Sequence, residues 1–281
     1  MTVSNLYEWA ICKGQNRKLR QLSLLALEED WSGGTKPAQD VDSEFFVLWK
    51  YIHHTFRYLI RKESHKIFEN SDYGCFNTGL EARIGYEEIF ALFRKNKDGR
   101  LELIGFFEES NNILDPVRGN LPEPANYLLD PADFIFDTNK PMTYKVKHIF
   151  ERQHRLPKVI ETIPPQYRED IIENRLRRAH KRVKRNYKLA IPQYSPRLDE
   201  IQLLIPICIE DENIADCALA VTKVNNTYKG KTILTMAMAY NNARLITKPD
   251  PAWLKPSKDI DDVEDEEDEE GIIITPEHVG E

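Results

Sequence analysis

The stretch ENRLRRAHKRVKRNYKLAIP, residues 173–192, has the apolar spacing of an amphipathic helix. Its apolar residues recur at steps of three or four, which is the repeat of one helical face. With the residue just before the stretch, they are Ile172, Leu176, Ala179, Val183 and Tyr187. Upstream, Pro165 suits the first turn of a helix, so the pattern predicts one helix from about Pro165 to Leu189. We expect its apolar stripe to face the core of the protein.

The other side of this predicted helix is almost entirely cationic. Eight Lys and Arg residues lie between positions 175 and 188 without an intervening acid, and neighbours three or four positions apart repel. Five of the eight are Arg, whose planar guanidinium group suits phosphate. Three interpretations stay open: contact with phosphate or nucleic acid, pairing with acidic residues of the same chain, and simple solvation. The residues that we assign to RNA or phosphate binding are Arg175, Arg178, Lys181, Arg182, Arg185 and Lys188.

Two tyrosines in or near this helix also have two interpretations. Tyr187 and Tyr194 could stack on bases, as aromatic residues do in proteins that bind single strands. They could equally be core aromatics, and the place of Tyr187 in the apolar stripe favours the core for that residue.

The net charge of the chain hides an asymmetry. The 281 residues carry a formal net charge of −7, yet residues 259–281 contain twelve acidic residues and no Lys or Arg. The remaining 34 acidic residues stand against 39 basic ones over residues 1–258, so that part is mildly basic. An acidic run cannot bury enough apolar surface to offset its ordering entropy, so we expect a disordered tail over 255–281.

Three roles are open for this acidic tail. It could occupy the basic helix and compete with a polyanionic ligand, because phosphate binding is largely electrostatic. It could serve solubility alone. Its apolar segment Ile272–Ile274 could also dock a protein partner.

The composition excludes several classes of protein. A hydrophobic content of 41% and a charged content of 30% are typical of a soluble globular protein. No apolar stretch approaches the ~18 residues that span a bilayer, so we expect no membrane association. The N-terminus lacks the features of a signal peptide, and the four cysteines form no CxxC pair. We therefore expect a cytoplasmic, reducing location.

The pattern along the chain predicts an α+β fold with N-terminal helices packed on a mostly antiparallel sheet. Residues 19–26 and 45–60 have helical spacing, with Gly33-Gly34 ending the first helix. Residues 66–78 and 89–107 are typical of two hairpins, residues 115–141 of a long loop, and residues 201–209, 218–224 and 232–239 of three strands. Pro206 argues that the first of these strands lies at an edge or carries a bulge. We assign residues 1–254 to one domain, with a possible subdomain at 1–80, and 255–281 to the tail.

Two polar islands follow expected strand ends. One is Cys75–Leu80 with Arg83 close behind, and the other is Ala239–Ile246. Their amides are of the kind that reads base edges, and Arg binds phosphate or carboxylate, although turns and helix caps use the same residue types. The predicted pocket residues are Asn77, Thr78, Arg83, Tyr240, Asn241, Asn242 and Arg244.

Conventional catalytic signals are absent from the sequence. It contains no GxxxxGK[ST], GxSxG or HExxH motif, and the adjacent His53 and His54 point to different faces of an expected helix. We therefore predict no metal site, and catalytic residues and cofactors stay unassigned. A metal-dependent nuclease is the alternative, because five carboxylates could bind a divalent ion: Glu108, Glu109, Asp130, Asp133 and Asp137.

Several separated motifs together resemble a known domain family. They are Phe76–Leu80 (FNTGL), Phe106–Ser110, Ala125–Tyr127, Asn186–Lys188, Pro192–Tyr194 and Tyr240–Leu245. Over roughly residues 5–254 the chain resembles a largely bacterial domain family of unknown function that occurs beside LOTUS (OST-HTH) and cold-shock modules. That company implies RNA-related work. The resemblance supplies no catalytic residues, and the acidic tail lies outside it.

The leading hypothesis is therefore an RNA-associated protein whose basic helix contacts phosphates and whose pocket takes a nucleotide or an RNA end. The second hypothesis is an enzyme that processes RNA or a nucleotide. The third is a protein-interaction module whose basic helix binds an acidic partner.

Overall fold

The computed structural model describes residues 4–32, 43–128, 130–249 and 253–254, and the predicted tail and the Gly33-Gly34 stop lie outside these residues. Contacts among the described residues divide them into two compact units, one up to Asn126 and one from Tyr127 onward. One domain over residues 1–254, with a possible subdomain at 1–80, stays a prediction. Residue 80 lies inside the paired strand Tyr73–Glu81, and the two compact units are divided after Asn126.

The first unit combines three helices with one sheet in the described residues. Its elements are α1 (Leu6–Trp9), β1 (Ala10–Ile11), α2 (Gln15–Leu25), α3 (Phe46–Lys62), β2 (Ile67–Glu69), β3 (Tyr73–Glu81), β4 (Glu88–Lys95) and β5 (Leu101–Glu108). The strand order is β1-β5-β4-β3-β2, and all pairs are antiparallel except the parallel pair β1–β5. Both predicted hairpins are confirmed.

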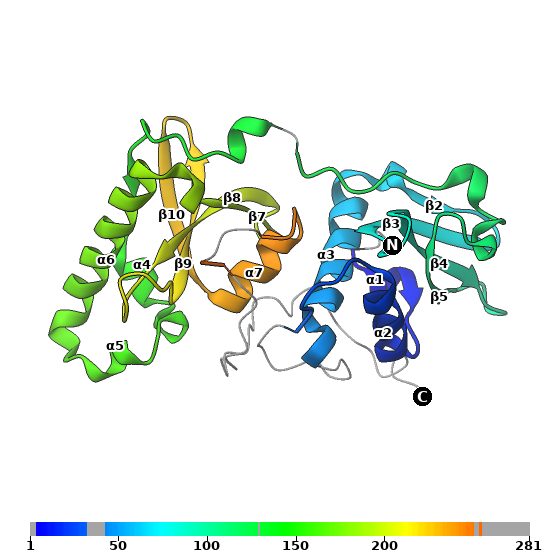
Figure 1. Cartoon of the computed structure of the whole chain (residues 1–281), viewed down its shortest axis with the longest axis horizontal. Coiled ribbons are helices and arrows are strands. Elements are labelled where there is room, and N and C mark those ends of the chain that lie inside the picture. Colours follow the sequence, from blue (N-terminus) through cyan, green and yellow to red (C-terminus); the bar gives the residue numbers. More distant parts are fainter. Residues whose placement is uncertain (1–3, 33–42, 129, 250–252, 255–281) are drawn as a thin grey trace. The chain divides into compact units, whose positions relative to one another are not determined.

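Helix α3 lies beside the sheet of this unit (Figure 1). Its buried residues provide the aromatic core, as its apolar spacing predicts. The ring of Phe56 lies 5.3 Å from the ring of Phe76 on β3, and Trp9 packs edge-on against Phe93 of β4. The opposite face of the sheet carries a second apolar cluster, in which Leu114 and Val117 cover Cys75 and Leu92. The sheet is therefore buried on both faces over part of its length.

The predicted loop over residues 115–141 contains only short 3-10 turns in its described residues. Around it these turns span Asn112–Leu114, Arg118–Asn120 and Pro131–Asp133. In the second, Arg118 bonds Asp115 and two backbone carbonyls, which holds the first turns together.

The second unit carries the basic helix on another sheet. Its elements are β6 (Met142–Thr143), α4 (Val146–Phe150), α5 (Val159–Thr162), α6 (Pro165–Arg185), β7 (Ile191–Ser195), β8 (Glu200–Ile207), β9 (Cys217–Val224), β10 (Thr227–Thr235) and α7 (Met236–Arg244). In the described residues the strand order is β6-β10-β9-β8-β7, with β6 parallel to β10 and the other pairs antiparallel. The α+β class and the mostly antiparallel pairing are confirmed, with two sheets in place of the expected single one.

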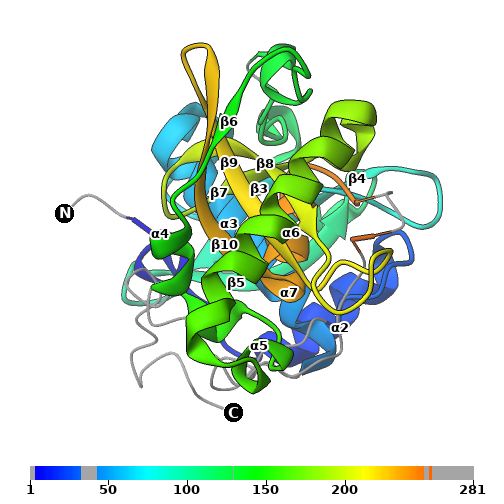
Figure 2. The same cartoon turned by 90° about the vertical axis from the view of Figure 1, so that its left-hand side faces the viewer.

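Helix α6 lies along one face of this sheet, while α7 lies on the other face (Figures 1 and 2). The stripe residues Ile172, Leu176, Ala179 and Val183 are all buried. They join one core cluster with residues of every second position on β8 and β9, such as Leu203 and Leu219. The prediction that the stripe faces the core is therefore confirmed for these four residues.

Tyr187 departs from that prediction. The α-helix ends at Arg185, and Asn186 has non-helical backbone angles (φ −143°, ψ 89°). A short 3-10 turn, Tyr187–Leu189, follows and turns the tyrosine outward, so that its exposed fraction is 47%. Ala190, rather than Tyr187, continues the buried cluster.

Two strand predictions also need correction. The strand expected over 232–239 ends at Thr235, whose hydroxyl oxygen accepts a hydrogen bond from Met238 N (3.3 Å) and so caps α7. Strand β8 is interior rather than at an edge, and its pairing with β7 stops at Leu204. Pro206, which has no N–H to donate, is therefore tolerated beyond that point.

Two further findings concern membrane-spanning helices and the cysteines. Among the described residues, no helix is both long enough and apolar enough to cross a membrane. All four cysteines are free and buried.

Truncation of the α6 stripe should destabilise the second unit. The Leu176 side chain has no exposed surface, so Leu176→Ala leaves a cavity and should lower the free energy of unfolding by about 2–5 kcal/mol. Leu198→Ala is the matched control, because Leu198 is 44% exposed in the same unit and should change stability by no more than about 0.5 kcal/mol. Urea denaturation followed by circular dichroism measures both. Equal losses in the two variants would contradict the packing described for α6.

Candidate functional site

The C-terminal end of α6 and the turn after it carry a cluster of exposed cations, here called the basic surface. It consists of Lys181, Lys184, Arg185 and Lys188, all of which are exposed. None of these four side chains forms a hydrogen bond or an ion pair with another described residue. Lys181, Lys184 and Arg185 fall at intervals of three and one residues on α6, so they lie on one side of the helix, and Lys188 lies in the 3-10 turn that follows. Their charge is available to a ligand.

The other cations of the helix except Arg175 are bonded within the second unit, while Arg175 is half-buried and forms no hydrogen bond or ion pair with another described residue. Arg177 pairs with Glu173 one turn earlier (3.1 Å). Both terminal nitrogens of Arg178 donate to the carboxylate of Glu212, in the loop between β8 and β9. Arg182 donates to the Glu212 carbonyl oxygen (2.9 Å) and lies 3.1 Å from Cys208 Sγ. The cations predicted to contact phosphate therefore fall into two groups, one free and one engaged.

Glu212 is the residue that holds the second group together. The hydrogen bond and charge of Arg178 lower the pKa of the Glu212 carboxyl group, and the charges of Arg175 and Arg182 act in the same direction. Glu212 is thus ionised at neutral pH and partly neutralises three arginines. Sequence reasoning missed it, because nothing in the local pattern near residue 212 links it to a helix about 30 positions earlier.

A nearby histidine and the helix dipole both bear on the charge of the basic surface. His180 has a lowered pKa, because partial burial and the nearby Lys184 both disfavour the imidazolium form. Arg182, Lys184 and Arg185 lie in the last turn of α6, where the helix dipole favours cations. This dipole offsets part of the repulsion among like charges without removing charge from the surface.

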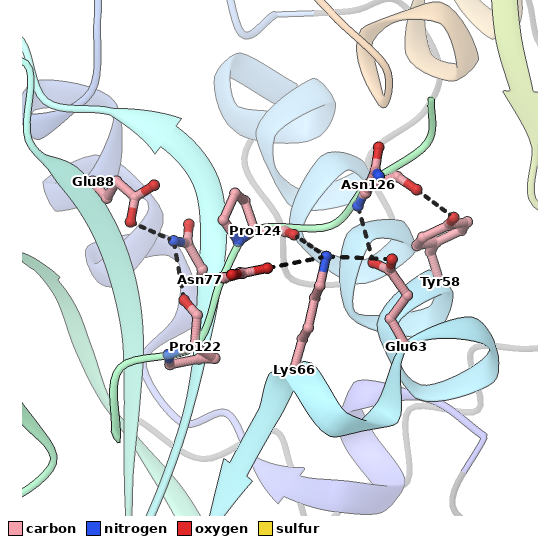
Figure 3. Close-up of polar contacts among 9 residues, drawn as sticks. Tyr58, Glu63, Lys66, Asn77, Glu88, Pro122, Pro124 and Asn126 are labelled. Carbon is pink, nitrogen blue, oxygen red and sulfur yellow. Dashed lines mark hydrogen bonds and ion pairs between the residues drawn. The ribbon is translucent and has the colours of Figure 1, made fainter. Parts of the chain in front are cut away.

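The first polar island has a structural role in the first unit (Figure 3). Pairing of β3 with β4 shifts register between Asn77 and Glu81, which is a bulge. Asn77 Nδ2 donates to Glu88 Oε2 (2.9 Å) and to the carbonyl oxygen of Pro122 (3.3 Å), and Asn77 Oδ1 accepts from Gly79 N (2.9 Å). The amide predicted to read a base edge is therefore occupied by protein groups.

The neighbours of Asn77 complete this bulge. Thr78 Oγ1 donates to the carbonyl oxygen of Ile89 (2.7 Å), and the Thr78 side chain is buried. Gly79 has φ +72°, and a Cβ there would lie 2.9 Å from the hydroxyl of Tyr51. Arg83, by contrast, is exposed. Within this island only Arg83 presents a free polar side chain at the surface.

The segment around residues 122–126 is fastened to α3 and the turn after it (Figure 3). Lys66 Nζ donates to the carbonyl oxygen of Pro124 (3.0 Å) and pairs with Glu63 (3.3 Å). Asn126 N donates to Glu63 Oε2 (2.9 Å), while Tyr58 donates to the Asn126 carbonyl oxygen (2.7 Å). These contacts give Asn126, one of the motif residues, a structural role as well.

The second polar island lies on helix α7 of the second unit, rather than in a loop after a strand. Tyr240 and Asn241 are buried, and Asn242 and Arg244 are half-buried. Asn241 Oδ1 has no hydrogen-bond partner among the described residues. Because Asn77, Thr78 and Arg83 belong to the first unit, the seven predicted pocket residues are divided between the two units.

The motif Pro192–Tyr194 contributes to a buried polar network on β7, β8 and β9. Gln193 Nε2 donates to Gln202 Oε1 (2.8 Å), and Gln202 Nε2 donates to Thr222 Oγ1 (3.0 Å). Tyr194 donates to Asp199, and its ring packs 5.2 Å from the ring of Tyr127. Tyr194 is buried, so of the two tyrosines only Tyr187 is open to a ligand.

The described residues contain no cluster of three or more His, Cys, Asp or Glu side chains that could hold a metal ion. Burial, together with the charges of His54 and Lys50, lowers the pKa of His53 to about 3, so this imidazole is neutral. The carboxylates of Asp130 and Asp133 are bonded to other groups of the protein. Asp130 accepts a hydrogen bond from Ala132 N (2.9 Å), and Asp133 pairs with Lys223 (3.0 Å).

The fold and the site define an α+β protein with a cationic helix packed on the sheet of its second unit. The chain belongs to the family described as Domain of unknown function (DUF3825), whose model matches residues 22–253. No curated protein and no solved structure matches the chain. The predicted resemblance to a family of unknown function is confirmed, while its bacterial distribution and its LOTUS and cold-shock neighbours stay predictions.

Proposed function

We propose that this protein binds RNA, and that the basic surface of α6 contacts the phosphate backbone. The observation that carries the proposal is the presence of four exposed cations at the C-terminal end of α6 and in the turn after it, with no ion pair to any described residue. Like charges at this spacing repel, and a polyanion that spans them relieves the repulsion. A cytoplasmic location in a bacterial cell belongs to the same proposal, and the buried free cysteines are compatible with a reducing compartment.

The arginines near Glu212 extend the proposed surface. Arg175, Arg178 and Arg182 lie around Glu212, so their charges are partly cancelled in the free protein. A strand that reaches past the four free cations would meet these guanidinium groups next. The predicted pocket and an enzymatic activity on RNA stay predictions.

Charge reversal on the basic surface should strongly weaken RNA binding. The variant Lys181→Glu/Lys184→Glu/Arg185→Glu removes three phosphate contacts, and the slope of log K against log salt should become shallower by about 2. The measurement is a filter-binding or anisotropy titration with a labelled RNA at several salt concentrations.

A matched triple reversal controls for net charge. Lys13→Glu/Arg17→Glu/Lys97→Glu changes three exposed cations of the first unit by the same total charge and should bind RNA nearly as the wild type does. Equal loss in both variants would show that net charge alone is responsible, and undiminished binding in the α6 variant would refute the proposed surface.

Neutralisation of Glu212 should strengthen RNA binding. Glu212→Gln removes the carboxylate that pairs with Arg178, so three arginines gain effective positive charge and the salt slope should become steeper. Glu210→Gln makes the same change of net charge in the same loop, and the Glu210 carboxylate forms no ion pair with a described residue. Both variants are measured by the same titration. A gain of affinity cannot come from misfolding, and an equal gain in both variants would argue against a specific role of Glu212.

Removal of the acidic tail should also strengthen RNA binding at low salt. Trp253 Nε1 donates to the carbonyl oxygen of Leu189 (3.0 Å), so the chain returns to the end of the basic surface just before the acidic run begins. Tethering at this place gives the run a high effective concentration there, and the gain on deleting residues 259–281 should shrink as salt is added.

A variant of unchanged length isolates the charge of the tail. Its acidic residues over 259–270 are replaced by Asn and Gln, and its affinity should match that of the truncated chain. Equal affinities for wild type and both variants would exclude competition by the tail.

An acidic protein partner is the rival for the same surface. If the purified chain retains a protein in stoichiometric amount and no nucleic acid, and binds no RNA in titration, the proposed function fails.

A further inference from the structure

Tyr187 is an exposed aromatic side chain between two cations of the basic surface, Arg185 and Lys188. A continued α-helix would place Tyr187 one turn after the buried Val183 on the apolar stripe, where burial of its ring would stabilise the fold. The chain forgoes that burial, because the helix ends at Arg185 and the ring is 47% exposed. Within the described part of the chain, Tyr187 makes no contact with another aromatic ring.

The backbone that carries this ring is held in place on both sides. Asn186 N bonds back to the last turn of α6 at the Arg182 carbonyl oxygen (3.0 Å), and Asn186 Oδ1 accepts from Lys188 N (3.2 Å). Ala190 N donates to the Tyr187 carbonyl oxygen (3.1 Å), which closes the 3-10 turn. Leu189 is tied in turn to the indole of Trp253. The backbone at Tyr187 is therefore held in place, which lowers the entropy lost when the turn binds a ligand.

We propose that Tyr187 is a platform on which an RNA base stacks while the neighbouring cations hold the flanking phosphates. The ligand of the basic surface is then single-stranded RNA, because bases in a duplex are stacked on one another and do not offer a free face to a protein ring. This inference rests on the proposed function and specifies its ligand. The charges alone would attract a polyanion that has no bases. An exposed aromatic ring among the cations adds affinity only for a ligand with a free base to stack on it.

A second tyrosine on the same helix provides a matched control. Tyr167 is 55% exposed near the start of α6. Its neighbour Arg168 donates to backbone carbonyl oxygens, and the acidic residues Glu169 and Asp170 come next. Removal of its ring changes the same amount of aromatic surface on the same helix. Tyr187→Phe is a further control, since it keeps the stacking ring and loses only the hydroxyl.

The experiment compares wild type, Tyr187→Ala, Tyr187→Phe and Tyr167→Ala on the full chain. The probes are a single-stranded oligouridylate, an RNA duplex of equal length and inorganic polyphosphate, which has the charges without bases. Tyr187→Ala should weaken oligouridylate binding by about 5- to 100-fold, the range for losing one base–aromatic stack. Binding of polyphosphate and duplex should be unchanged, and the other two variants should bind all three probes as the wild type does.

Each other outcome is decisive. If Tyr187→Ala binds oligouridylate normally while the Lys181/Lys184/Arg185 triple variant loses it, stacking is refuted and the proposed RNA-binding surface stands. If Tyr187→Ala loses oligouridylate and polyphosphate equally, the residue acts on the charges or the fold of the turn, and stacking is again refuted. If wild type prefers the duplex, the single-strand assignment is wrong. If wild type binds none of the three probes, the proposed function itself fails.

Discussion

Burial of one apolar stripe of α6 against strands β8 and β9 determines what the rest of this helix does. With Leu176 and Val183 fixed in the core, the remaining positions of the helix have to face outward or along its flanks. From Arg175 to Arg185 the chain places a cation at every one of these positions except His180, so packing and electrostatics are set by the same register. A single-residue shift of that register would bury a charged group, which costs far more than the stripe gains.

The charge on the helix is divided by the tertiary structure into engaged and available parts. Glu212 approaches from the loop between β8 and β9 and pairs with Arg178, while Arg177 is paired within the helix. The cations nearer the C-terminal end reach no such partner in the described residues. The paired arginines therefore lie near Glu212 and Glu173. The unpaired cations lie at the end of the helix, where the following turn also exposes Tyr187. The surface therefore combines unpaired positive charge with an exposed aromatic ring.

The asparagine-rich motifs show why residue type alone is a poor guide to a pocket. Asn77 sits at a bulge whose geometry exposes backbone groups that need partners, and its amide satisfies one of them together with groups of Glu88 and Pro122. The sequence alone does not distinguish an asparagine that completes a bulge from one that binds a base. Only the partners that surround the amide distinguish them, and those partners come from other parts of the chain.

Local patterns in the sequence predict the α+β class, the two hairpins of the first unit, the extent of α6 to within a few residues and the side of α6 that is buried. Periodicity and turn residues encode these features, because neighbouring positions decide them. The family membership also follows from sequence, since it depends on motif order. Three other features follow only from the folded chain. Glu212 neutralises part of the cationic face, the helix stops before Tyr187, and the two polar islands belong to separate units. Those outcomes depend on contacts between residues tens of positions apart, and a local pattern carries no record of which distant side chain will arrive.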